Sequence, residues 1–300
     1  MPDTISNEDN LAEAAEMTYV KVDPCSTRLG NWMFQYAAAK CAAPGEPVAF
    51  VIAGGQSIDA VRKYAALWPE AEYVRAAPEG ASVRIGLFQD WKRLEPDIVR
   101  RLFKCPAEVE TRIEAKYGRA VADWDDVVSV HVRRGDYISL PHRHPFVGVK
   151  YLERAVAIFA ARGGGRRMRF LVCSDDIAWC RRFFSRKEFK GHDFIFSEGN
   201  DVMTDLFMMA KCRSGHICSN SSFSFWGAYL GALDSPPGAQ LTVFPSMWFG
   251  MAIKDQDGSG MYFPGSQVIE NSYSLPQRLS ALLHMAKTAA GNVLRRIGRR

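Results

Sequence analysis

Two adjacent arginines, Arg133 and Arg134, follow a valine-rich run at 127–132 and precede Gly135. A guanidinium is a planar fork of N–H donors that matches two oxygens of a phosphate, and glycine lets the backbone approach a ligand closely. The run predicts a buried strand, and open α/β sheets hold ligands at the carboxyl ends of strands. This position suits a phosphate site, but a salt-bridged arginine pair on a surface loop would show the same spacing.

Two carboxylates follow a second apolar run. Residues 170–173 predict another strand, and Ser174, Asp175 and Asp176 come directly after it, with Ser174 as the expected N-cap of the next helix. The helix dipole favours acidic residues in the first turn whatever the function, so capping is the simpler interpretation. A carboxylate there could also accept a hydrogen bond from a ribose hydroxyl, as acids do in nucleotide-binding sheets.

Polar residues are dense at a third strand end. A predicted strand at 216–219 delivers Asn220, Ser221 and Ser222 to the start of a helix. Unpaired backbone N–H groups and hydroxyls at a helix start form a seat for an anion. An ordinary N-cap needs only one such side chain, so the sequence predicts an anion site here as well.

The sequence contains no recognisable metal site. His142 and His144 lie in one short loop segment, too close together for a pair of ligands on a helix, and the predicted site loops contain no D-x-D sequence. The seven cysteines are an odd number at irregular spacings, with no C-x-x-C pair, which indicates reduced and mostly buried thiols. Neutralisation of a phosphate would then fall to arginines and helix ends.

Short strands that alternate with helices must position these residues, and this alternation is typical of parallel α/β layers. Strands are expected at 19–23, 47–53, 83–88, 127–132, 170–173, 194–196, 216–219 and 241–244. Gly30 and Asn31 open the first predicted helix, where glycine allows a second close approach to a ligand. The length of 300 residues favours two packed units, divided near 120–126.

Composition excludes several classes of protein. With 47% hydrophobic and 24% charged residues, the chain is globular rather than disordered or dominated by heptads. No run approaches the roughly 18 apolar residues of a membrane span. Residues 1–16 contain no Lys or Arg and no apolar segment, so they predict no secretory signal, and the cytosol is the expected compartment.

The net charge of +5 becomes informative once it is located along the chain. Residues 286–300 hold five basic and no acidic side chains, whereas residues 1–16 hold five acidic and no basic ones. The basic tail, with Val293, Leu294 and Ile297, could touch an anionic membrane surface or a nucleic acid, although a solvated helix end is the simpler interpretation. The body has no aromatic residues interleaved along a basic stripe, so no nucleic-acid partner is expected.

Four segments taken in this order resemble bacterial α-1,2-fucosyltransferases of glycosyltransferase family 11. They are L-G-N-W-M-F-Q-Y-A at 29–37, H-V-R-R-G-D-Y at 131–137, S-D-D at 174–176 and C-S-N-S-S-F-S-F-W-G-A-Y-L at 218–230. The resemblance implies a GT-B-like α/β fold with two Rossmann-like domains and parallel sheets. It implies an acceptor-side domain at 17–122, a GDP-sugar-binding domain at 123–275 and a basic helix or tail at 276–300. From the pattern along the chain, the final helix from Pro276 onward is expected to pack back on the first unit.

The resemblance also implies a role for each matching residue. Arg133 and Arg134 would bind the donor pyrophosphate, and Ser221, Ser222 and Phe223 would form the phosphate-binding helix start. His131 and Asp205 would lie near the nucleoside, and Asp175 and Asp176 near the sugar or ribose. Gly30 and Asn31 would belong to a loop that closes over the donor. Many relatives have two glycines and a glutamine where this chain has Thr27, Arg28 and Trp32. These departures leave the acceptor preference open.

The implied reaction is an inverting transfer of L-fucose from GDP-β-L-fucose to the 2-hydroxyl of a terminal galactose, without a metal or another cofactor. Arg133 and Arg134 would stabilise the departing diphosphate, and Asp136 is the expected general base, with Asp175 and Asp176 as rivals. Asp136 could instead only orient Arg134. A fucosyltransferase of another linkage, a transferase for another nucleotide sugar and a non-catalytic binding module remain alternatives. The expected location is the cytoplasm, with contact to the inner membrane face through the basic tail as a further option.

Overall fold

The computed structural model describes residues 17–22, 28–52, 58–121 and 123–297, with side chains as far as residue 290. The chain divides into two compact units. The first comprises Met1–Phe88 and Arg93–Leu102, and the second comprises Gln89–Lys92 and Phe103–Arg300. The predicted boundary between 122 and 123 therefore lies inside the second unit, because α4 (Ala107–Tyr117) packs against α8 (Val202–Lys211) of that unit.

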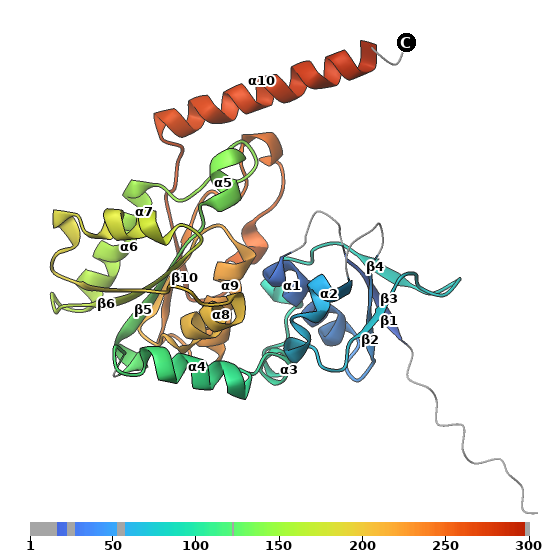
Figure 1. Ribbon diagram of the computed structural model, residues 1–300, viewed down its shortest axis with the longest axis horizontal. Helices are drawn as coiled ribbons and strands as arrows, with labels where there is room; N and C mark the ends of the chain where they lie inside the picture. The colour runs from blue at the N-terminus through green and yellow to red at the C-terminus, as the bar shows by residue number, and fades with distance from the viewer. Residues whose placement is uncertain (1–16, 23–27, 53–57, 122, 298–300) are drawn as a thin grey trace, which may run out of the picture. The chain divides into compact units, whose positions relative to one another are not determined.

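The first unit is built on a parallel sheet of four strands in the order β3-β2-β1-β4 (Figure 1). The strands are β1 (Thr18–Lys21), β2 (Val48–Val51), β3 (Glu72–Val74) and β4 (Val83–Ile85), and the helices are α1 (Leu29–Ala42), α2 (Ile58–Arg62) and α3 (Pro96–Leu102). The buried Gln35 of α1 donates to the carbonyl oxygens of Lys21 (3.1 Å) and Gly86 (2.9 Å). This side chain anchors α1 to the carboxyl ends of the two neighbouring strands β1 and β4.

The second unit contains a parallel sheet of six strands in the order β10-β9-β8-β5-β6-β7. The strands are β5 (Val127–Val132), β6 (Arg169–Ser174), β7 (Asp193–Phe196), β8 (Gly215–Ile217), β9 (Leu241–Pro245) and β10 (Ser266–Ile269). The helices are α4, α5 (Gly135–Ser139), α6 (Val149–Arg162), α7 (Ile177–Phe184), α8, α9 (Ser222–Leu233) and α10 (Leu275–Ile297).

This strand order is that of a doubly wound sheet. The chain runs outward from β5 through β6 to β7, then returns to place β8 on the other side of β5. In such sheets the ligand crevice lies where the order reverses, outside the carboxyl ends of the two strands. That point is between β5 and β8. The predicted α/β fold with two Rossmann-like units and parallel sheets is confirmed by the two sheets.

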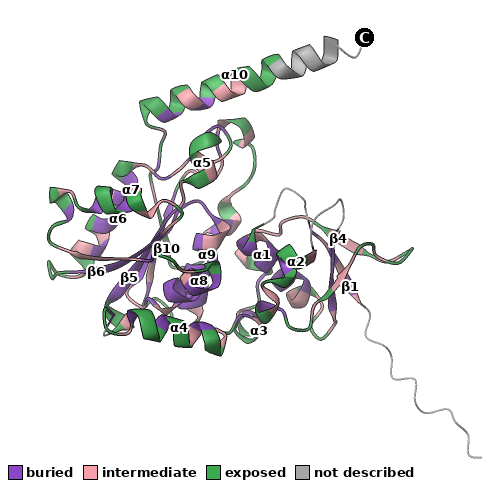
Figure 2. Ribbon diagram, viewed as in Figure 1, coloured by how far each residue is buried: buried purple, intermediate pink, exposed green. Residues whose placement is uncertain are grey.

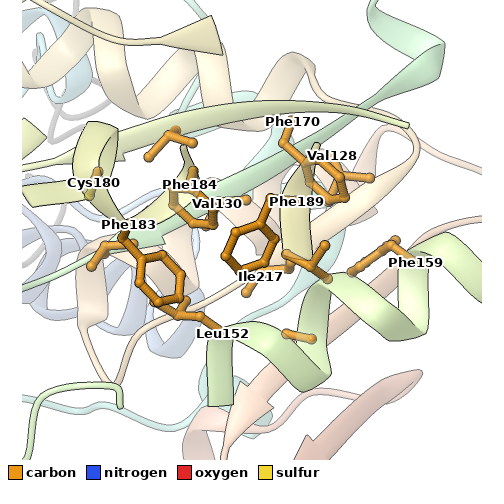
Figure 3. Close-up of a cluster of buried hydrophobic side chains, with 14 of the residues drawn as sticks. Val128, Val130, Leu152, Phe159, Phe170, Cys180, Phe183, Phe184, Phe189 and Ile217 are labelled. Atoms are coloured by element: carbon orange, nitrogen blue, oxygen red, sulfur yellow. The ribbon is translucent and has the colours of Figure 1, made fainter. Parts of the chain in front are cut away.

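Helices cover both faces of the second sheet, as burial of parallel strands requires. On one face, side chains of β5, β6 and β8 form a hydrophobic core with α6 and α7 (Figure 3). Labelled members of this core are Val128, Val130, Leu152, Phe159, Phe170, Cys180, Phe183, Phe184, Phe189 and Ile217. The intervening residues of β5, Ser129 and His131, point to the other face, where they bond His216 of β8 and Ser224 of α9. Figure 2 shows the helices of that face, α8 and α9, as largely buried.

The last helix, α10, attaches to the second unit. The Gln277 side chain donates to the carbonyl of Phe146 (3.2 Å), and the ring of His284 stacks on that of His142 with centroids 5.3 Å apart. The sequence predicts a helix that packs back on the first unit, whereas the described contacts of α10 lie on the second.

Candidate functional site

The loops that follow β5 and β8 are joined by hydrogen bonds. The backbone N–H of Arg133 donates to the Ser219 hydroxyl (2.9 Å), which itself donates to the carbonyl of His131 (2.7 Å). The hydroxyl of Tyr137 donates to the carbonyl of Asn220 (2.9 Å). The arginine segment (131–137) and the serine-rich segment (218–224) were predicted separately from the sequence. These hydrogen bonds show that they meet at the point where the strand order reverses.

The guanidinium of Arg133 bridges two carboxylates. One terminal nitrogen lies 2.6 Å from Asp136 Oδ1, and the other lies 2.7 Å from Asp175 Oδ2. The Arg133 side chain is 20% exposed, and the two carboxylate side chains are 31% and 26% exposed. A cation is thus held at the end of the central strand β5, with both of its anionic partners accessible to water.

Arg134 points toward α7. Its Nε donates to Asp176 (3.0 Å), and its guanidinium lies 4.0 Å from the centre of the Trp179 ring, a cation–π distance. Burial alone would raise the pKa of Asp176, but the hydrogen bonds from Arg134 and from the Trp179 N–H hold this pKa below its usual value. The two predicted phosphate-binding arginines therefore have different partners.

Capping of α7 differs from the prediction in one residue. Asp176 is the N-cap, because its carboxylate accepts the Trp179 N–H (3.0 Å). Ser174 is still part of β6; its hydroxyl donates to the Val132 carbonyl (2.7 Å) and accepts the Asp176 N–H (3.0 Å). Asp175, by contrast, accepts from the Arg134 backbone N–H (2.8 Å). Capping thus explains Asp176, whereas Asp175 faces the arginines.

Gly135 has a physical reason that the sequence did not indicate. A Cβ at this position would lie 2.5 Å from Asp175 Oδ2, closer than atoms can approach. The glycine leaves room for the carboxylate that pairs with Arg133. Close approach of a ligand, the interpretation from the sequence, is not needed to explain it.

The start of α9 is organised by side chains that do separate tasks. Ser221 is the N-cap and accepts the Phe223 N–H (3.3 Å). The Asn220 side chain, 2% exposed, donates to the carbonyl of Trp248 (3.0 Å), and its Oδ1 is buried without a hydrogen-bond partner among the described residues. Ser222 is the first residue of α9 and is half-buried. Asn220 thus holds the loop to Trp248, and Ser221 and Ser222 lie at the start of α9.

His131 is buried behind the arginines. Its Nδ1 lies 2.5 Å from the Ser224 hydroxyl, which also accepts the Ser219 N–H, and its ring lies 5.3 Å from that of Phe223. Burial lowers the pKa of His131 to about 4, although the nearby Asp175 charge opposes this shift. The imidazole is therefore neutral at neutral pH, and it links β5 to the first turn of α9.

Asp205 lies in the first turn of α8. Its carboxylate accepts a hydrogen bond from the Ser197 hydroxyl, and Asn200 donates to the same hydroxyl (2.7 Å). Burial raises the pKa of Asp205 above its usual value, against the effect of these hydrogen bonds. The described hydrogen bonds connect Asp205 with the loop after β7.

The first unit holds the remaining predicted residues. Gly30 and Asn31 lie in the first turn of α1, Gly30 buried and Asn31 half-buried. Of the departures from the family pattern, Arg28 is the exposed residue preceding α1, and Thr27 lies outside the described residues. Trp32 is only 2% exposed, so it belongs to the core of this unit.

The described part of the chain offers no metal centre of its own. Its residues contain no group of three or more His, Cys, Asp or Glu side chains that could hold a metal ion. Six cysteines that the structure describes are free thiols, four of them buried. Its helices are each too short or too polar to cross a lipid bilayer.

The residues that join the two loops were not predicted from the sequence. Ser219 and Ser224 belong to the serine-rich segment and Tyr137 to the arginine segment, but their residue types alone assign them no role. The only available signal for Ser219 is its position at a strand end next to a helix start. The bond between Ser219 and Arg133 depends on β8 lying beside β5, which the sequence does not show.

The fold and this edge define a doubly wound α/β protein in which two arginines, three aspartates and a serine-rich helix start meet at the switch point. Residues 99–245 match the family model described as Glycosyl transferase family 11. This similarity to glycosyltransferase family 11 covers just under half of the chain.

Two relatives and one solved structure illustrate the similarity. An α-1,2-colitosyltransferase of Escherichia coli is 30% identical over 179 residues, which cover 59% of this chain and 59% of that protein. Galactoside α-(1,2)-fucosyltransferase 1 of Saimiri sciureus is 32% identical over 133 residues, or 43% of this chain and 35% of that protein. The crystal structure of NodZ α-1,6-fucosyltransferase soaked with GDP-fucose is similar with a TM-score of 0.43 and 13% identity, covering 72% of this chain and 92% of that one. The chain thus spans less than two thirds of the length of both curated relatives.

Proposed function

We propose that the protein transfers L-fucose from GDP-β-L-fucose to the 2-hydroxyl of a terminal galactose in a glycan, with inversion at the fucose C1 and without a metal. The observation that carries this proposal is the position of Arg133 at the switch point. Its guanidinium lies between two carboxylates, and its backbone N–H donates to Ser219, which in turn bonds Ser224 in the first turn of α9. The match of residues 99–245 to the family 11 model and the names of the two relatives support the reaction class.

The donor diphosphate is proposed to replace the Asp136 and Asp175 carboxylates as the partner of the Arg133 guanidinium. This guanidinium forms ion pairs with Asp136 and Asp175. A diphosphate carries more charge than either carboxylate and matches the planar donor fork at two points. The N–H groups at the start of α9, next to Ser221 and Ser222, supply further donors. Positive groups that stabilise a departing anion usually contribute more to catalysis than any other single effect.

Asp136 is the proposed general base. The bond between fucose C1 and the β-phosphate oxygen breaks, GDP leaves, and the galactose 2-oxygen bonds C1 from the opposite side. The hydroxyl proton passes to the Asp136 carboxylate. Because Asp136 pairs with Arg133 rather than with Arg134, the diphosphate that occupies Arg133 also frees this carboxylate. Donor binding and activation of the base would therefore be coupled through one guanidinium.

The other proposed donor contacts follow from position. Asp175, which directly follows β6, can accept a hydrogen bond from a ribose or sugar hydroxyl, and Asp176 is the next residue. His131 and Phe223 form one wall of the nucleoside site, and Asp205 is proposed to accept N–H donors of guanine. Arg134 completes the diphosphate site if it leaves Asp176 on donor binding.

The deciding experiment is an incubation of the purified protein with GDP-fucose and a panel of β-galactosides, followed by linkage analysis of the product. An α-1,2-linked fucoside formed equally well with and without a chelator is expected. Loss of activity in the chelator would contradict the metal-free proposal. Binding of GDP without any product would favour the alternative of a non-catalytic nucleotide-sugar or glycan-binding module.

A colitosyl donor is the second candidate, because the E. coli relative is an α-1,2-colitosyltransferase. The same incubation with the GDP-linked colitosyl donor, and with UDP- and ADP-sugars as controls, distinguishes the donors by initial rates. Fucose on a different acceptor hydroxyl would identify a fucosyltransferase of another linkage. For location, we propose the cytoplasm, with contact to the inner face of the membrane through the C-terminal basic residues.

A further inference from the structure

The helix α10 exposes a stripe of leucines. Leu275, Leu279, Leu282 and Leu283 are 72%, 53%, 48% and 62% exposed. Spacings of three and four residues place these side chains along one side of a helix. In Figure 2 most of the described length of α10 is exposed. Four large apolar side chains on one helix face form a patch of the kind that marks an interaction site.

The stripe points away from the protein. The buried residues of α10 are Gln277, which is 6% exposed and bonds Phe146, and Ala281, which is 0% exposed. With about 3.6 residues per turn, these two lie roughly half a turn around the helix from Leu279. The helix is thus attached to the second unit by one face and presents its leucines on the opposite face.

The basic residues of α10 favour an anionic partner for this leucine stripe. Residues 271–300 contain six Lys or Arg residues and no Asp or Glu. Arg278 and Lys287 are exposed, and the helical period places them on the two flanks of the leucine stripe. A second copy of this helix would bring like charges together along the contact. An anionic lipid surface complements both the cationic flanks and the apolar stripe.

We propose that α10 lies in the plane of an anionic membrane surface, with its leucines among the acyl chains and with Arg278 and Lys287 at the phosphates of the headgroups. The helix does not cross the bilayer. Its attachment through Gln277 and His284 would hold the second unit against the membrane. This proposal deepens the location given under Proposed function, but it does not depend on the identity of the donor or acceptor.

The test is co-flotation of the full-length protein with vesicles. We expect binding to vesicles of phosphatidylcholine with about one-third phosphatidylglycerol, and much weaker binding to phosphatidylcholine alone or at high salt. Leu279→Gln and Leu282→Gln should each weaken partitioning about tenfold, since each removes the transfer of a leucine side chain into an apolar phase. Arg278→Gln and Lys287→Gln should each weaken it about fivefold.

Val268→Gln is the matched control, because it removes an exposed apolar side chain of the same unit outside α10. It should bind like the wild type. No binding to phosphatidylglycerol vesicles, or equal binding by the Leu279→Gln/Leu282→Gln variant, would overturn the proposal. So would a wild-type dimer in solution that this double variant dissociates. Transfer to a soluble acceptor should be unchanged in every variant, so failure of the proposed reaction is separately visible.

Discussion

Arg133 and Arg134 are neighbours in sequence with different environments. Arg133 pairs with Asp136 and Asp175, and Arg134 pairs with Asp176 and stacks on Trp179. The guanidinium of Arg133 lies between α5 and Asp175, and that of Arg134 lies at the N-terminus of α7. In the proposed reaction, the diphosphate of the donor replaces the carboxylates that pair with Arg133. Substitutions at Arg133 and at Asp136 separate the roles of these charges.

Arg133→Lys is expected to lower kcat/KM by a factor of about 10² to 10³, because an ammonium keeps the charge and loses the planar fork. Affinity for GDP should fall as well. Arg119→Lys, at an exposed position of the second unit, is the matched control and should behave like the wild type. Steady-state kinetics and calorimetric titration with GDP measure both effects. Near-normal kinetics of Arg133→Lys would remove this residue from the diphosphate site.

Asp136→Asn should reduce turnover at least about 100-fold, the usual contribution of a general base. Affinity for GDP should stay within a few-fold of the wild type, because the amide no longer competes for Arg133 and removes no donor contact. A carboxylate that only positions Arg133 would instead lose turnover and GDP affinity together. If turnover of this variant stays within a few-fold of the wild type, another residue is the base.

At the scale of elements, the site depends on how tightly α9 is held. Two glycines of α9 face α8 and β8. A Cβ at Gly227 would lie 2.8 Å from Met209, and a Cβ at Gly231 would lie 2.8 Å from His216 Nε2 and 3.0 Å from the Ala210 backbone oxygen. The absence of side chains at these positions lets α9 pack closely against its neighbours. The position of Ser221 and Ser222 at the other end of α9 follows from this packing.

Gly231→Ala is expected to destabilise the protein by at least about 1 kcal/mol, even though alanine favours the helix by a similar amount. The added methyl group must displace the His216 ring, which bonds Gln240 (3.1 Å), or the α8 backbone. Urea unfolding measures the change. Gly191→Ala, where no atom lies within 4 Å of the new Cβ, is the control and should change stability by less than about 0.5 kcal/mol. Equal stability of both variants would contradict this account of the packing.

At the scale of the whole molecule, two buried histidines couple stability to pH. His216 lies between Ser129 (2.7 Å) and Gln240 (3.1 Å), and the Gln240 amide nitrogen donates to Cys212, so its oxygen accepts from His216 Nε2. Burial lowers the pKa of His216 to about 4, as it does for His131. Both imidazoles are neutral in the folded protein at neutral pH, whereas a histidine of the unfolded chain takes up a proton near its ordinary pKa of 6.5.

The sign of the effect follows from proton uptake. Between the folded pKa of about 4 and the unfolded pKa of 6.5, the unfolded state binds more protons, so stability falls as pH falls through this window. Each histidine contributes roughly 1 kcal/mol per pH unit there. Urea unfolding from about pH 7 to about pH 5 should show the slope, and His216→Gln should reduce it. Identical slopes for the two proteins would refute the assignment.

Much of the fold could be predicted because its central elements carry strong patterns. The run at 127–132 is buried throughout β5, and the strand at 170–173 matches most of β6. The strands β3 and β10 were missed, because each contains only two consecutive apolar residues, Tyr73–Val74 and Val268–Ile269. The extent of the second unit was also missed, since the contact of α4 with α8 joins segments far apart in sequence.

The sequence by itself determined which polar residues follow which strands, since strand ends and helix starts are set by local patterns of apolar and capping residues. Only the tertiary structure decided that β8 lies beside β5, so that Ser219 bonds Arg133, and that Asp136 and Asp175 share the Arg133 guanidinium. It also decided that the leucines of α10 face outward. Strand order and the choice among equivalent charges depend on contacts between distant segments, which a local pattern does not contain.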